Sequence, residues 1–333
     1  MSRAAGARLP RFGTTLLVAA GVAPDLDYAS YFAGASSFLA SHRSALHSLS
    51  GGVALACALA AIACWVEKKW PPLASVRARK AQPPLSFLPA LALAVIGIAA
   101  HDVLDLASSE GIQLFWPFRS HWTRWSLTQN FDPWILALLI TALLLPQLFR
   151  LVREEVGARS KRATGAGTAI AALVLLCAYF GGRAYLHSRA LETLLSSEYH
   201  GREPLAAGAF PSSSNPFEWR GVVSTENTLE EIAVNLQSGA DFNPDRSLTH
   251  YKPADSLVLD AAQKAPATQK FLSYAELPLA SVARREDGYR IELRDLQFPQ
   301  GDTTPANIAV RVDLNSAYRI TRQQLRYASA GAE

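Results

Sequence analysis

The sequence predicts an α-helical polytopic membrane domain of about five helices, followed by an external soluble domain with an α+β, mostly β, fold. Three observations lead to this prediction. Apolar residues make up 50% of the 333-residue chain and charged residues only 18%, below the roughly 25% of an average soluble protein. The apolar residues gather in long runs before residue 190. Residues 1–190 carry 18 Lys and Arg against 9 Asp and Glu, whereas residues 191–333 carry 14 against 19.

Four apolar runs are candidate membrane spans, since a span needs about 20 residues with a range of roughly 17–25. A fifth run, Phe12–Ala23, is shorter. We expect it to form a first helix and not a signal peptide, because no small-residue cleavage site follows it before Asp25. The chain then divides into a membrane domain over residues 1–190 and a soluble domain over 191–333. The four longer runs are Leu49–Val66, Phe87–Leu106, Trp134–Phe149 and Thr168–Leu186.

Basic residues cluster in alternate connections between these runs, and Lys and Arg are retained on the cytoplasmic side of a membrane. Five helices therefore place the N-terminus in the cytoplasm. Residues 24–48, residues 107–133 and the C-terminal domain are then periplasmic or extracellular. Nucleic-acid binding is a weaker interpretation, because no basic stripe joins the clusters, and we expect no nucleic-acid partner. The clusters are Arg3, Arg8 and Arg11; Lys68, Lys69, Arg77, Arg79 and Lys80; and Arg150, Arg153, Arg159, Lys161 and Arg162.

Aromatic residues crowd the predicted external segment 107–133 and the start of the next run. Trp and Tyr favour the membrane–water interface, where an amphipathic ring is partly hydrated. A packed aromatic core is an alternative that is compatible with this interpretation. These residues are Phe115, Trp116, Phe118, Trp122, Trp125, Phe131 and Trp134.

The pattern changes after Leu186. We expect the last helix to continue to about residue 202, a loop to follow over Glu203–Pro216, and strands to begin after it. Short alternating runs between turn residues favour β-structure, and Ser256–Phe271 is a candidate helix. The chain contains no glycine-rich phosphate loop, no Gly-x-Ser-x-Gly elbow and no Cys-x-x-Cys pair. The strand candidates are Trp219–Ser224, Glu231–Leu236, Tyr289–Leu293 and Ala309–Leu314.

Ionisable residues occur at the outer end of the third predicted helix. His101 and Asp105 are separated by four residues, so both lie on one face of that helix, whereas Asp102 points elsewhere. An ionisable residue inside a span is costly and is usually functional, with an internal partner. The alternative is a His–Asp hydrogen bond that only joins two helices.

Two further polar stretches are predicted on the same side of the membrane. Asp25 and Asp27 directly follow the first helix, and two carboxylates this close repel each other unless a cation lies between them. His42 and His47 lie at the start of the second helix, about 140° apart on an ideal helix. They converge if His42 belongs to the preceding turn. Arg43 could hold an anionic group or a carboxylate. A solvated loop and an interfacial segment are the alternatives.

Imidazole and carboxylate groups without thiolates suit Zn²⁺, Mn²⁺, Fe²⁺ or Mg²⁺, and we expect a divalent metal, with Zn²⁺ or Mn²⁺ as the leading candidates. The orientation that places all three stretches on one side uses Lys and Arg alone, so it is independent of His and Asp. A bound metal lowers the pKa of a water molecule and polarises an ester or phosphoryl oxygen. The sequence therefore predicts a metal-dependent hydrolase.

In order and spacing, residues 24–118 resemble the YdjM-like family of bacterial inner-membrane proteins, which are described as membrane-bound metal-dependent hydrolases. The C-terminal half also resembles the long members, through Asn215-Pro216-Phe217-Glu218-Trp219-Arg220 and Asp295-Leu296-Gln297-Phe298. The resemblance implies a multi-pass protein of the bacterial inner membrane. Over residues 24–118 the resemblance depends on these motifs: Pro24-Asp25-Leu26-Asp27; His42-Arg43 with His47-Ser48; and His101-Asp102-x-x-Asp105 leading to Glu110-Gly111 and Trp116-Pro117-Phe118.

The resemblance further implies a metal and catalytic cluster, with Arg43 and Asp102 beside it. One departure is that family members usually carry a Thr-His pair at the start of the first helix, whereas this chain has Thr14-Thr15 and no His before His42. The predicted metal ligands are Asp25, Asp27, His42, His47, His101 and Asp105, and the predicted catalytic residues are His42, Arg43, His47 and Asp102.

The leading hypothesis is an integral membrane hydrolase that acts on an ester or phosphoester at the outer face of the inner membrane. The metal activates water, a second His or Asp moves protons, and Arg43 stabilises negative charge. Membrane lipids are the expected partners, and a lipid-linked or phosphoester substrate is expected. A second hypothesis is a non-catalytic, membrane-anchored binding or scaffold protein that displays the external domain. A third, an ion or proton pathway, is disfavoured because the cytoplasmic halves of the helices contain almost no ionisable residues.

Overall fold

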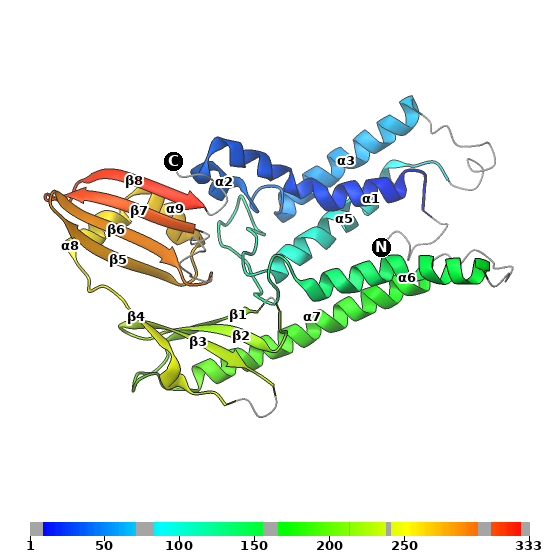
Figure 1. The fold of residues 1–333 in the computed structure, drawn as a ribbon. Helices are drawn as coiled ribbons and strands as arrows, with labels where there is room; N and C mark the ends of the chain where they lie inside the picture. The colour runs from blue at the N-terminus through cyan, green and yellow to red at the C-terminus, as the bar shows by residue number, and fades with distance from the viewer. Residues whose placement is uncertain are drawn as a thin grey trace.

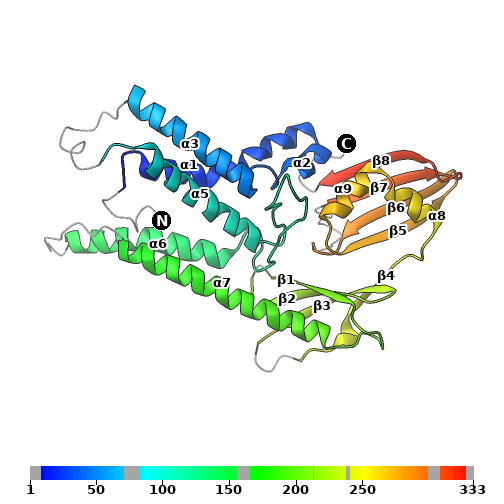
Figure 2. The same cartoon turned by 180° about the vertical axis from the view of Figure 1, so that it is seen from behind.

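The computed structural model describes residues 9–70, 83–155, 166–212, 214–237, 241–298 and 308–327. Apolar helices extend together from one end of the molecule, and two antiparallel four-stranded sheets form the other end (Figures 1 and 2). The predicted fold class, a helical membrane region followed by a mostly β region, is confirmed.

Within the described residues, three helices are long and apolar enough to cross a membrane: α3 (Leu49–Lys69), α5 (Phe87–Ala107) and α7 (Ala166–Leu195). In α6 (Pro133–Glu155) the apolar part is shorter, Pro133–Phe149. The first helix, α1 (Gly13–Val22), has 10 residues. All five predicted apolar runs are therefore helical, and three of these helices reach the length of a membrane span.

These helices pack in two sets, which we call the α1/α3/α5 arm and the α6/α7 arm. Both α1 and α3 pack against α5, whereas α6 packs against α7. The contact between α1 and α5 requires small residues. A Cβ added to Gly97 of α5 would lie 2.7 Å from the carbonyl oxygen of Leu17 and 2.8 Å from the Cβ of Ala20. Small residues at a helix–helix contact allow the two backbones to approach closely.

A 3-10 helix, Ala23–Ala33, and the short helix α2 (Ala35–Ser41) connect α1 to a turn over residues 42–48. Ser48 then caps α3, because its Oγ accepts a hydrogen bond from the backbone N–H of Gly51. A Cβ on Gly51 would lie 1.7 Å from the carbonyl oxygen of Ala45, so only glycine allows the turn to fold over the start of α3. This path returns residues 42–48 to the end of α1.

The end of α7 packs against the first sheet, where Ala190 and Leu194 lie in one apolar cluster with Trp219. The predicted boundary at residue 190 thus falls inside α7, which carries the chain from the helices into the sheet. The strands of this sheet are adjacent in sequence order: β1 (Ala206–Pro211), β2 (Glu218–Ser224), β3 (Thr228–Asn235) and β4 (Leu248–Tyr251).

The second sheet is also antiparallel with its strands in sequence order, and α8 (Leu257–Gln263) and α9 (Pro266–Tyr274) pack on one face of it. Its core includes Leu39 of α2 and Trp122 of the loop between α5 and α6, so this sheet is joined to the helical part. Its strands are β5 (Pro278–Arg285), β6 (Gly288–Asp295), β7 (Ile308–Asn315) and β8 (Ile320–Tyr327).

The four predicted strands correspond to β2, β3, β6 and β7, but three other expectations are wrong. The last helix, expected to continue to about residue 202, ends at Leu195. The predicted loop Glu203–Pro216 contains β1, which begins with small Ala and Gly residues, has no β-branched residue and forms by pairing with β2. The predicted helix Ser256–Phe271 is two helices, because Ala265 is extended ahead of Pro266. Strands β4, β5 and β8 were not predicted.

The predicted cytoplasmic clusters are described only in part. Lys68 and Lys69 end α3, at the end of the helical region that points away from the sheets (Figure 1). Arg11 lies 4.0 Å from Glu67 near the same end. Outside the described residues lie Arg3, Arg8, Arg77, Arg79, Lys80, Arg159, Lys161 and Arg162, and the side chains of Arg150 and Arg153 are likewise not described.

The α1–α5 contact predicts that Gly97→Ala destabilises the protein. The added methyl group would force the two helices apart, and overpacking of this kind costs about 1–3 kcal/mol. The matched control is Gly181→Ala on α7, where a Cβ would meet nothing within 4 Å. Thermal unfolding of the purified protein in detergent checks this, and equal melting temperatures for the two variants would contradict the close contact.

Candidate metal centre

Histidines and aspartates converge where α1, α3 and α5 end on the side of the sheets. They come from three separate segments: the 3-10 helix after α1, the turn over residues 42–48, and the last turns of α5. On α5, His101 and Asp105 continue the buried face of the helix that includes Ala94 and Gly97. The residues are Asp25, Asp27, His42, His47, His101 and Asp105.

Ligand atoms of His47, His101, Asp105 and Asp25 lie close together at the centre of this cluster. The Nε2 atoms of His47 and His101 are 3.2 Å apart. Oδ2 of Asp105 lies 3.2 Å from the first and 3.3 Å from the second. Oδ1 of Asp25 lies 3.6 Å from His101 Nε2, and Asp25, His47 and His101 offer ligand atoms that all lie within 4.8 Å of one another. Around tetrahedral zinc, with bonds of about 2.0–2.2 Å, neighbouring ligand atoms are about 3.3–3.6 Å apart.

The second ring nitrogen of each histidine faces an oxygen. His101 Nδ1 donates to the carbonyl oxygen of Gly21 at 2.9 Å. His47 Nδ1 lies 3.2 Å from Oδ2 of Asp27, close enough for an ion pair although not aligned as a hydrogen bond. These contacts favour a proton on each Nδ1 and leave the Nε2 lone pairs facing each other. Such lone pairs repel at this distance unless a proton or a metal ion lies between them.

Asp105 contributes an oxygen that is suited to a cation. Its Oδ2 is buried and, within the described part of the chain, has no hydrogen-bond partner. Its Oδ1 lies 3.1 Å from the guanidinium of Arg43. An unsatisfied buried oxygen is costly, and a metal ion would satisfy it. Two imidazoles and two carboxylates are a ligand set that fits Zn²⁺ or Mn²⁺.

Asp27 lies behind His47, on the far side of the ring from His101. Its Oδ1 accepts a hydrogen bond from His42 Nδ1 at 3.0 Å, and its Oδ2 accepts one from the backbone N–H of Arg43 at 2.8 Å. Burial opposes the charge on Asp27, but the hydrogen bond from His42 and the nearby rings of His42 and His47 outweigh burial and hold the pKa of Asp27 well below the usual range. The carboxylate therefore stays ionised and orients His47.

His47 is completely buried between two carboxylates. Burial disfavours its imidazolium form, but the carboxylates of Asp105 and Asp27 outweigh that effect and raise the pKa of His47 to about 9. A metal ion bound at Nε2 would replace the second proton of this ring, as metal binding to histidine does generally.

Two further predicted catalytic residues, His42 and Asp102, lie beside these candidate ligands. The His42 ring stacks on Phe38 at 4.4 Å between centroids, and its centroid is 6.2 Å from that of His47. Asp102 points toward α3, where its Oδ2 would lie 3.9 Å from a Cβ on Gly52. Its Oδ1 is buried, with no hydrogen-bond partner in the described residues.

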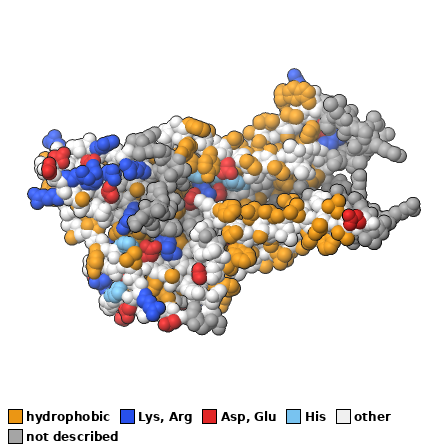
Figure 3. Space-filling view, in the orientation of Figure 1, with side chains coloured by type: hydrophobic (Ala, Val, Ile, Leu, Met, Phe, Trp, Pro, Cys, Tyr) orange, Lys and Arg blue, Asp and Glu red, His pale blue; other side chains and the backbone are white. Residues whose placement is uncertain are grey.

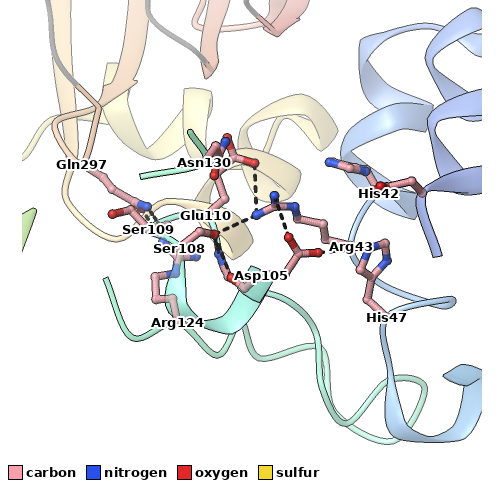
Figure 4. Close-up of polar contacts among 12 residues, drawn as sticks. His42, Arg43, His47, Asp105, Ser108, Ser109, Glu110, Arg124, Asn130 and Gln297 are labelled. Carbon is pink, nitrogen blue, oxygen red and sulfur yellow. Dashed lines mark hydrogen bonds and ion pairs between the residues drawn. The ribbon is translucent and has the colours of Figure 1, made fainter. Parts of the chain in front are cut away.

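Arg43 connects the cluster to the loop that follows α5 (Figure 4). Its guanidinium contacts Asp105 at 3.1 Å and Glu110 at 3.4 Å, and it donates to Ser108 Oγ at 2.9 Å. Its backbone has φ 55°, a left-handed conformation that is uncommon outside glycine. No role was predicted from the sequence for Ser108 or Glu110. Only their position just after Asp105 could have indicated that they contact the cluster.

The C-terminal domain contacts this same loop (Figure 4). The side-chain amide of Gln297 donates to the carbonyl oxygen of Ser109, and Arg124 donates both to Gln297 and to the carbonyl oxygen of Tyr274. Trp122 packs edge-on against Tyr274 at 4.8 Å. Trp122 is buried in a core, as the second interpretation of the aromatic segment expects, while Phe118 and Phe131 are exposed.

The family model described as YdjM inner membrane protein matches residues 2–190. The matched region contains the whole His/Asp cluster and ends before the first strand. No curated protein matches the chain, and no solved structure matches it.

The contact of Asp27 with His47 predicts that Asp27→Asn weakens Zn²⁺ binding about 10–100-fold, the usual effect of losing the partner of a ligand histidine. Titration with Zn²⁺ against a competing chelator in detergent measures this. The matched control is Asp132→Asn, which removes a carboxylate that accepts from Tyr179 at the start of α6. Wild-type affinity in Asp27→Asn would contradict the orienting role.

Proposed function

The chain belongs to the YdjM inner membrane protein family, and we propose that this multi-pass inner-membrane protein is a metal-dependent hydrolase. The substrate would be an ester or phosphoester at the outer face of the membrane. The observation that carries the proposal is the facing pair of Nε2 atoms in His47 and His101, with Oδ2 of Asp105 within 3.3 Å of both.

His47, His101 and Asp105 would hold the metal, with Asp25 as the fourth ligand. The ion, when bound, lowers the pKa of a water molecule and polarises an ester or phosphoryl oxygen. Asp25 is the most exposed of the four side chains. The substrate therefore approaches from the side of Asp25.

The remaining polar residues position the ligands and move protons. His42 and Asp27 orient His47, and Arg43 holds Asp105 in place while offsetting its charge. Asp102 has a buried oxygen that no hydrogen bond occupies among the described residues. A carboxylate in this situation is suited to accept or deliver a proton during hydrolysis.

The alternative is a non-catalytic, membrane-anchored protein that displays its C-terminal domain to a binding partner. The observation in its favour is that the family match ends at residue 190, while both sheets lie beyond it. In that case the His/Asp cluster would only join α1, α3 and α5. Metal content and hydrolysis separate the two functions.

The hydrolase proposal predicts about one equivalent of metal per chain in the full-length protein purified in detergent. His101→Ala should lose the metal, and its hydrolysis of phosphoester and lipid-ester substrates should fall at least about 100-fold, because several kcal/mol of charge stabilisation are lost. His250→Ala is the control, since His250 lies on β4 beside Glu231. Elemental analysis and an activity screen with added Zn²⁺ or Mn²⁺ measure these effects. No metal in the wild type would refute the proposal, and bound metal with no hydrolysis would favour the scaffold alternative.

The proposed orientation places the N-terminus in the cytoplasm and the C-terminal domain in the periplasm or extracellular space. Protease added to intact spheroplasts should then digest the C-terminal domain, because both sheets lie on the outer side. A cytoplasmic protein serves as the control for intact cells. Digestion only in inverted membrane vesicles would reverse the orientation.

A further inference from the structure

We propose that the substrate of this site is a membrane lipid that enters sideways from the bilayer, with its acyl chains between the two helical arms and its headgroup at the His/Asp cluster. This inference rests on the proposed function and specifies its substrate class. The bound lipid would come from the leaflet that adjoins the C-terminal domain, and its ester or phosphoester group would lie beside Asp25.

The side of the cluster that faces the C-terminal domain is closed. His42, Arg43 and Glu110 are all buried there. The backbone N–H of Gln113 donates to the carbonyl oxygen of Arg43 at 2.9 Å, which fixes the loop over the turn. A cavity between this turn and Tyr274 of the C-terminal domain has a volume of about 10 Å³, enough for about one water molecule. A substrate in the external solution therefore meets packed side chains on this side.

The cluster is open beside Asp25, whose side chain is 41% exposed, compared with 13% for His101 and 13% for Asp105. Asp25 and Asp105 each have an exposed leucine as a neighbour in the chain. Leu26, next to Asp25, is 66% exposed, and Leu104, next to Asp105, is 42% exposed. Exposed leucines of this kind are suited to contact acyl chains, so lipid can reach the open side of the cluster.

The arrangement of the helices provides a place for those chains. Figure 3 shows the two arms separated by a cleft, with hydrophobic side chains along both. Charged and histidine side chains are visible where the cleft reaches the external part of the molecule. The extensive helix–helix contacts lie within each arm, and α3, α5 and α7 have the composition of membrane spans. The hydrocarbon core excludes water, so lipid chains fill the space between the arms.

The depth of the cluster matches the position of a lipid headgroup. His101 and Asp105 belong to the last two turns of α5, a span of 21 residues, which covers the hydrocarbon thickness of about 30 Å. Trp125 and Trp134 are exposed near the start of α6, and exposed Trp marks the membrane–water interface. The ester and phosphate groups of a lipid lie at this level, whereas its chains extend toward the bilayer centre.

The test uses the full-length protein in lipid nanodiscs that contain a phospholipid with a photoreactive group beside its glycerol. Illumination should attach this lipid to the peptides that contain Leu26 and Leu104. Leu26→Trp and Leu104→Trp should each reduce attachment at the other peptide at least fivefold, because the bulky ring obstructs the opening. The control is Ile62→Trp, an exposed position on α3. It lies about 20 Å along the helix from Leu49, the residue that begins α3 at the end near the cluster.

Attachment at both peptides in the wild type and in Ile62→Trp, with loss in the two Trp variants at the opening, supports the inference. Absence of wild-type attachment, or equal attachment in all variants, overturns it. This readout requires no hydrolysis, and metal content is measured on the same samples. Bound metal without lipid attachment would refute the lipid substrate alone, whereas lipid attachment without metal would refute the hydrolase.

Discussion

The facing Nε2 atoms of His47 and His101 impose a constraint that organises much of the surrounding structure. Two imidazole lone pairs 3.2 Å apart require positive charge between them, and positive charge in a buried site requires carboxylates around it. Asp105 and Asp25 face the shared centre, while Asp27 and the carbonyl of Gly21 hold the outer sides of the two rings. The approach of α1 to α5 at Gly97 brings these groups within reach of one another.

The cluster also explains how a polar centre is tolerated at the end of apolar helices. Three charged pairs form inside the protein: Asp27 with His42, Asp105 with Arg43, and Arg43 with Glu110. Arg43 extends this network to the loop after α5, and Gln297 of the C-terminal domain binds the same loop at Ser109. The second sheet therefore stabilises the outward side of the cluster while the side of Asp25 stays open. This asymmetry is the physical basis for the proposed access from the bilayer.

Sequence reasoning identified the helical runs and the residues that converge, because apolar length, charge asymmetry and the four-residue spacing of His101 and Asp105 are local signals. It could not distinguish the candidate metal ligands from the residues that orient them. The position of Asp27 behind His47 depends on how the 42–48 turn folds back over α3. The strand β1 was missed because its Ala and Gly residues form a strand only by pairing with β2. The contact of Trp122 with Tyr274 joins segments about 150 residues apart, and no local pattern predicts it.

The central claim is that two histidines and nearby carboxylates bind one divalent metal at the end of α5. X-ray absorption spectroscopy of the zinc-loaded protein in detergent tests it most directly, because the spectrum reports the ligand atoms themselves. The account predicts two imidazole nitrogens together with carboxylate oxygens at about 2.0–2.2 Å from the metal. A spectrum of hydrated zinc without imidazole ligands, or a failure of the protein to retain zinc, would contradict it.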